Sequence, residues 1–157
     1  MLTGGLFAQA TKDVTMTVTL KAWYDLSVGL SALTFTDVQP AIVAAPGNQS
    51  IAANEGAVNV RAFAVTRAAD TLKLNVQAGT NLISGSDTIP AGAISWTATG
   101  SGYSAGSLAT TAVEAGSWTG SVLHWHEGSF TFSFLRNYAT QAPGAYSATA
   151  TYTLSVI

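Results

Sequence analysis

The sequence predicts an all-β protein built as a two-layer antiparallel sandwich, and three observations predict it. Several stretches alternate apolar and hydroxyl-bearing residues with a period of two, as strands with one buried face do. Gly, Pro and Asn turns separate these stretches, and none carries an apolar stripe of helical period. Charged residues make up only 9% of the chain, so Thr and Ser hydroxyls rather than charges solvate the outer faces.

The clearest strand is the last one, from Tyr146 to Ile157, which follows a turn at Pro143-Gly144. Its apolar positions share one face: Tyr146, Ala148, Ala150, Tyr152, Leu154 and Val156. A second clear strand covers residues 13–21, where apolar residues alternate with Thr and Lys, namely Val14, Met16, Val18 and Leu20. Both stretches are therefore expected to pair within the sandwich.

Shorter strands are predicted between these two, separated by turn signals. They cover residues 23–28 and 33–38, a hairpin of 58–65 with 71–78, residues 94–98 and 108–113, and a hairpin of 117–126 with 129–135 that turns at Glu127-Gly128. The total of eight to ten strands predicts an Ig-like antiparallel β-sandwich over residues 13–157. Residues 1–12 form a separate N-terminal extension in this interpretation.

Charge and cysteine content exclude several classes of function. The formal net charge is −2, from 6 Lys+Arg and 8 Asp+Glu, and no basic stripe indicates a nucleic-acid partner. No apolar run approaches the length of a membrane span. Because the chain has no cysteine, it has neither disulfides nor thiolate chemistry. A composition this poor in charge and rich in Thr, Ala and Gly is typical of secreted β-proteins and surface-fibre subunits.

A family resemblance rests on the C-terminal run Pro143-Gly144-Ala145-Tyr146-Ser147-Ala148-Thr149-Ala150-Thr151-Tyr152-Thr153-Leu154. It resembles the closing strand of secreted fimbrial or pilin-like β-sandwich subunits, in which Gly-x-Tyr precedes alternating Thr. The cysteine-free members of that group are the better comparison, because the paired cysteines of many bacterial pilins are missing here. The resemblance implies an extracellular filament on the cell surface, in which copies of the chain join by strand donation. It also implies roles in adhesion and biofilm.

The N-terminus supplies a candidate donor strand for such a polymer. Residues 2–10 are apolar and uncharged, and a strand of this kind can fill a groove in the next subunit. Large side chains would anchor it and two glycines would allow close backbone approach, so the predicted polymerisation interface is Leu2, Gly4, Gly5, Leu6, Phe7 and Ala8. Ala8-Gln9-Ala10 also resembles a cleavage site, but the apolar run before it is short and lacks a basic region.

The two histidines are the one metal-like pair in the sequence. On a strand, His124 and His126 point to the same face and lie close enough to share a metal ion. Two ligands alone are a weak signal, so we expect a structural pair and no cofactor. Nucleophile elbows and phosphate loops are absent, and the acidic residues are scattered beside turns. We therefore expect no enzymatic activity.

Aromatic residues support an alternative function, a secreted module that binds carbohydrates or another surface. Trp23 and Trp96 follow the inward alternation and are predicted to lie in the core. Trp118 and Trp125 remain open between core positions and a sugar-stacking platform for host or community surface glycans. Asn48 begins an Asn-Gln-Ser triplet in an expected exposed loop, which makes it a candidate glycosylation site.

Overall fold

The computed structural model describes residues 14–20, 23–38, 47–120 and 123–157. These residues form ten β-strands and one 3-10 helix, in the range predicted from the sequence. In chain order they are β1 (Tyr24–Val28), β2 (Asn48–Ala64), β3 (Thr71–Ala78), β4 (Leu82–Ser84), β5 (Asp87–Ile89), η1 (Ala91–Ala93), β6 (Ile94–Thr99), β7 (Gly106–Ser107), β8 (Val113–Thr119), β9 (His126–Asn137) and β10 (Ala150–Val156).

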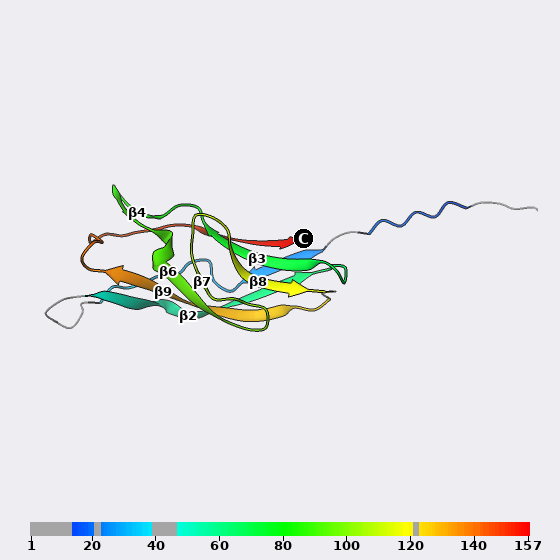
Figure 1. Cartoon of the computed structure of the whole chain (residues 1–157), viewed down its shortest axis with the longest axis horizontal. Helices are drawn as coiled ribbons and strands as arrows, with labels where there is room; N and C mark the ends of the chain where they lie inside the picture. The colour runs from blue at the N-terminus through cyan, green and yellow to red at the C-terminus, as the bar shows by residue number, and fades with distance from the viewer. Residues whose placement is uncertain (1–13, 21–22, 39–46, 121–122) are drawn as a thin grey trace, which may run out of the picture.

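The strands form two facing layers (Figure 1). One sheet has five strands in the order β1-β2-β9-β6-β7, the other has three in the order β10-β3-β8, and β4 and β5 form a small separate ladder. Each strand pairing is antiparallel. The predicted all-β antiparallel sandwich is therefore confirmed.

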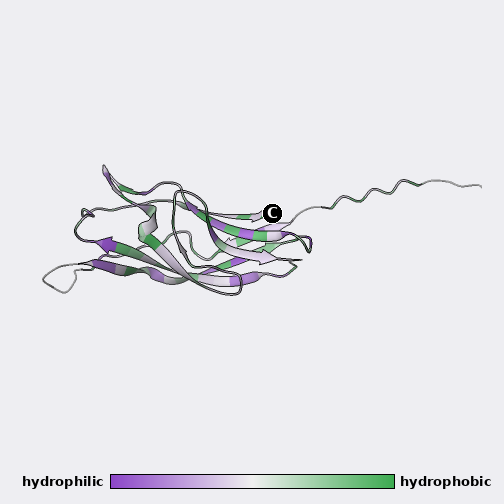
Figure 2. Cartoon of the chain, viewed as in Figure 1, coloured by the Kyte–Doolittle hydropathy of each residue, from purple (hydrophilic) through white to green (hydrophobic). Residues whose placement is uncertain are grey.

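Alternating residues build the core between the two layers. In β3, Leu72, Leu74 and Val76 are buried, while Lys73 and Gln77 are turned outward. Figure 2 shows this alternation as green and purple bands along β3. The five-stranded sheet contributes the opposite wall with Val58, Val60, Ala62, Ala64, Trp96, Phe130 and Phe132, all buried. Every second residue of these strands is apolar, and the face that these residues form is the one that packs in the core between the layers.

The predicted hairpin of residues 58–65 with 71–78 is wrong. The first segment lies in β2, which pairs with β1 and β9, whereas β3 belongs to the other sheet. The connection over residues 65–70 carries the chain from one layer to the other. A short polar loop serves either connection, so the sequence pattern does not distinguish a hairpin from a crossing between layers.

The predicted turn at Glu127-Gly128 is also wrong, since β9 runs through both residues. Strand β8 pairs with β3, and β9 pairs with β2 and β6. Gly128 is needed within the strand because a Cβ there would lie 2.5 Å from the Tyr103 ring. This glycine provides room for an aromatic neighbour, and the strand continues past it.

Candidate functional site

The two sides of the sandwich are closed to different degrees. Residues 100–106 cover one side, next to β7 and β8, and aromatic side chains hold them in place. Trp96 Nε1 donates a hydrogen bond to Ser104 O (2.9 Å), and Trp118 Nε1 donates to Ser101 O (2.8 Å). The Tyr103 ring packs edge-on against that of Trp118, at 4.9 Å between centroids. The rings of Trp96, Tyr103 and Trp118 therefore seal this side, and both indole N–H groups have a hydrogen-bond acceptor.

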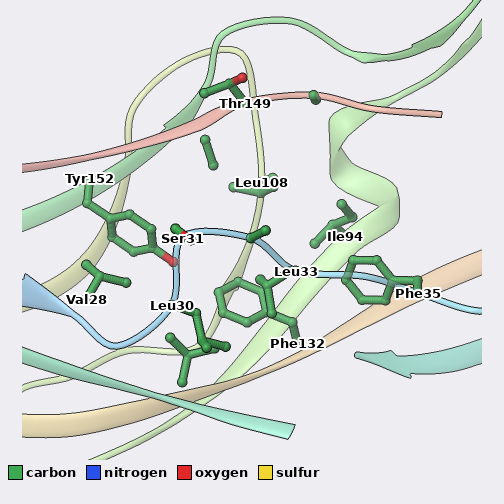
Figure 3. Close-up of a pocket in the computed structure, with 14 residues that line it drawn as sticks. Val28, Leu30, Ser31, Leu33, Phe35, Ile94, Leu108, Phe132, Thr149 and Tyr152 are labelled. Carbon is green, nitrogen blue, oxygen red and sulfur yellow. The ribbon is translucent and has the colours of Figure 1, made fainter. Parts of the chain in front are cut away.

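The opposite side, where the edge strands β1 and β10 lie, is hollowed by an apolar groove. We call it the edge groove: the space between residues 28–37 of one layer and residues 142–152 of the other. Its first part has a volume of about 360 Å³ (Figure 3). The side chains that point into it are mainly aliphatic or aromatic: Val28, Leu30, Leu33, Phe35, Ile94, Leu108, Phe132 and Tyr152.

A second hollow of about 340 Å³ continues the edge groove, and Phe35 lines both parts. Its floor is again apolar, but it ends among polar groups. There Arg136 Nε lies 3.2 Å from Asp37 Oδ2, and the Tyr138 hydroxyl donates to Asp37 Oδ1 (3.0 Å). The edge groove is therefore apolar along its length and charged at one end.

One wall of the edge groove is an extended segment held on a single side. Gly29 N donates to Asn59 O (2.8 Å) and Asn54 N donates to Thr34 O (2.9 Å), so the segment runs along β2. The Thr34 amide also donates to the Glu55 carboxylate, and hydrogen bonds from Thr34 lower the pKa of Glu55. The predicted strand at 33–38 is thus extended and attached to β2, although it forms no regular ladder.

Strand β10 forms the other wall and pairs on one side only, with β3. Tyr152 of β10 faces the edge groove, and burial raises the pKa of its hydroxyl to about 12. That shift indicates surroundings that disfavour charge. Within the residues that the structure describes, both walls therefore have one paired backbone edge and one edge without a ladder partner.

Residues 14–20 lie outside the sandwich and extend away from it (Figure 1). Their apolar side chains are largely exposed: Val14 72%, Met16 86%, Val18 79% and Leu20 89%. The sequence predicted this segment as a paired strand of the domain. That prediction is wrong, because residues 14–20 belong to none of the described strands.

The histidine pair is brought together as predicted. The rings of His124 and His126 lie 4.8 Å apart, and His126 stacks on Trp118 at 4.6 Å. Burial, and then the neighbouring His124, lower the pKa of His126, and its buried Nε2 has no hydrogen-bond partner among the described residues. No group of three potential metal ligands occurs in the described part of the chain. The structural role of the pair stays a prediction.

The tryptophans divide between core and surface. Trp96 lies in the core as predicted, and Trp118 is buried as well. The prediction for Trp23 is wrong, since this side chain is 64% exposed just before β1. Trp125 packs on Phe63 (5.4 Å), and the Arg61 guanidinium lies 4.6 Å over its ring.

The remaining predicted residues have mixed outcomes. Asn48 is exposed as expected, although it is the first residue of β2 rather than part of a loop, and its glycosylation stays a prediction. The predicted interface residues lie outside the described residues: Leu2, Gly4, Gly5, Leu6, Phe7 and Ala8. Sequence reasoning missed the edge groove. Its only signal was the alternation of Leu33 and Phe35, which shows an apolar face but not an open one.

No family model matches the sequence, and no curated protein matches it. Among the described residues, no helix has both the length and the apolar character needed to cross a membrane.

Proposed function

We propose that this protein is a structural subunit of an extracellular filament, in which copies join head to tail by N-terminal strand donation. One observation carries the proposal: an exposed segment with alternating apolar residues, 14–20, and an open apolar groove occur on the same chain. Burying one large aliphatic side chain contributes about 1.5–3 kcal/mol, so leaving four of them in water is unfavourable. Assembly offers a means of covering both surfaces at once.

The geometry of such a contact favours a filament over a closed dimer. The donor and the edge groove are different surfaces, so the contact between two copies is heterologous. Each copy that accepts a strand still offers its own, and the polymer therefore grows at both ends. Backbone hydrogen bonds to the free walls would add to the apolar contact, as in other cases of strand addition.

The Ig-like description is a proposal about the layers rather than the strand order. Two antiparallel layers of this size support it. The pairing order is different, because an Ig domain pairs its second strand with its fifth, whereas β2 here pairs with β1 and β9. The low charge content and the hydroxyl-rich outer faces support secretion. The roles in adhesion and biofilm are what the resemblance to fimbrial subunits implies.

Electron microscopy of the purified full-length protein tests the filament. We expect unbranched fibres with a regular axial repeat and a mass that grows with protein concentration in light scattering. Monomers at every concentration, across a range of salt and pH, would contradict the proposal.

The alternative, a module that binds carbohydrates or surfaces, has less support. Trp118 is buried against His126, and Arg61 covers one face of the Trp125 ring. The exposed pair Trp23 and Tyr24 at β1 is the remaining candidate platform in the described residues. Glycan-array binding that is lost in Trp23→Ala, by a protein that stays monomeric, would favour this alternative.

A further inference from the structure

We propose that residues 14–20 of a second copy of this chain occupy the edge groove. Val14, Met16, Val18 and Leu20 would face into it, with Thr15, Thr17 and Thr19 facing outward. This assignment rests on the proposed function and names its donor. It differs from the sequence-based prediction, which placed the donor within residues 1–12.

The exposure pattern of the segment is the first support. Its four even-numbered side chains are the most exposed large hydrophobic residues that the structure describes. They share one face of an extended strand, and threonines form the other. A strand with one apolar and one polar face is the pattern that β3 and β10 use to pack, and in β10 the polar face carries hydroxyl groups, as it does in residues 14–20. The segment therefore has the form of a sandwich strand without a sandwich to cover it.

Length and charge fit the edge groove. Seven extended residues span about 23 Å, and the wall over residues 28–37 runs for about 33 Å by the same rise per residue. The segment itself is uncharged, and charged residues flank it in the sequence at Asp13 and Lys21. The edge groove is likewise apolar in its length, with Asp37 and Arg136 at one end. Placing residues 14–20 inside thus buries no charge.

The occupant comes from another copy because the segment leads away from its own domain (Figure 1). Among the residues that the structure describes, the two walls each offer a backbone edge without a ladder partner, on β10 and on residues 29–37. A strand inserted between them adds hydrogen bonds to one wall while its side chains fill the hollow. The same insertion covers the exposed edge of β10, which otherwise invites unspecific pairing.

Charged substitutions on the two faces of the segment provide the first test, in the full-length chain. Met16→Asp/Val18→Asp would place two carboxylates in the apolar edge groove, and we expect the critical concentration for filament growth to rise about a hundredfold or more. The matched control Thr17→Asp/Thr19→Asp carries the same charge on the outward face, and it should assemble nearly as the wild type does. Thermal unfolding of the monomers, measured below the critical concentration, should be unchanged in both, because residues 14–20 lie outside the sandwich of their own chain.

Disulfide trapping provides a second test that does not depend on losing assembly. Because the chain has no cysteine, introduced pairs are unique. Val18→Cys is combined in turn with Leu33→Cys and with Ala148→Cys, one on each wall. Oxidised filaments of at least one pair should give a ladder of multimers on a non-reducing gel. Thr17→Cys in the same combinations should give little or none.

Different failures separate this assignment from the proposed function. Normal assembly of Met16→Asp/Val18→Asp, or a disulfide that closes within one chain, overturns the assignment. If filaments persist in that variant and vanish in Leu2→Asp/Leu6→Asp, the donor lies in residues 1–12 and the filament proposal stands. A wild-type protein that never polymerises overturns both.

Discussion

Two segments of this chain have almost the same pattern and opposite surroundings. Residues 14–20 read VTMTVTL and residues 150–156 read ATYTLSV, with apolar residues at every even position. The second segment is β10, where Tyr152, Leu154 and Val156 are half-buried against the core. The first is exposed on both faces. Alternation therefore specifies a strand and its inward face, but the partner must come from elsewhere: β3 for β10, and a second copy in our proposal for residues 14–20.

The largest expected effect tests this comparison directly, with the same charged substitution at matching positions of the two segments, Leu154 and Val18. Leu154 lies opposite the fully buried Leu74 in the β10–β3 ladder. Leu154→Asp should lower the free energy of unfolding by about 3 kcal/mol, since it loses apolar contact and brings a carboxylate to the core. In the monomer, Val18→Asp should leave that free energy unchanged. Urea unfolding followed by tryptophan fluorescence measures both, and equal losses would mean that residues 14–20 pack on their own domain.

A second prediction sharpens the contrast between the sealed and the open side. Gly102 has φ +81°, and a Cβ there would collide with the Trp118 indole. Gly102→Ala should therefore destabilise the monomer by about 2–3 kcal/mol. Gly47 has nothing within 4 Å of such a Cβ and no positive φ, so it serves as the unstrained control. Chemical denaturation that gives the same stability for Gly102→Ala and Gly47→Ala would show that the loop over residues 100–106 is not tightly held.

The smallest effect concerns pH at the sealed side. The folded-state pKa of His126 is lowered, so the unfolded chain takes up a proton first as pH falls below the ordinary value of 6.5. Stability from this group is complete above that pH and declines below it. The loss should be a few tenths of a kcal/mol, because the ring is only partly buried and solvent screens its charge. His126→Phe should flatten the dependence of the free energy of unfolding on pH below 6.5. An unaltered slope would mean that other titrating groups cause this dependence.

The sequence was sufficient for the class of fold and for most of the strands, although the strands predicted at residues 14–20 and 108–113 are not formed. Period two identified β3, β6 and β10, because each has one face against the core and the apolar residues mark it. It did not predict which strands share a sheet, since strands of both layers carry the same alternation. Trp23 was misplaced for a related reason: it continues the alternation beyond the end of the ladder, where no opposite layer covers it.

The candidate site was less accessible to sequence reasoning. A groove arises where two edge strands lack a neighbour, and an absent strand leaves no mark in a sequence. The exposure of residues 14–20 was hidden in the same way, because the alternation of Val14 and Leu20 with threonines is also that of core residues, and only the structure shows them in solvent. The prediction of a donor strand near the N-terminus required neither the position of the groove nor the exposure of residues 14–20.

The long pairing of β2 with β9 has a consequence for the timing of folding. Asn48 lies opposite Asn137, so the five-stranded sheet cannot form before most of the chain has been synthesised. Pairings between distant parts of a sequence also fold slowly, because loop closure precedes any gain from contact. Residues 14–20 are complete long before that sheet exists. In our proposal, newly made chains therefore carry a donor before they have an acceptor, and the completion of β9 and then of β10 determines when subunits become competent to join.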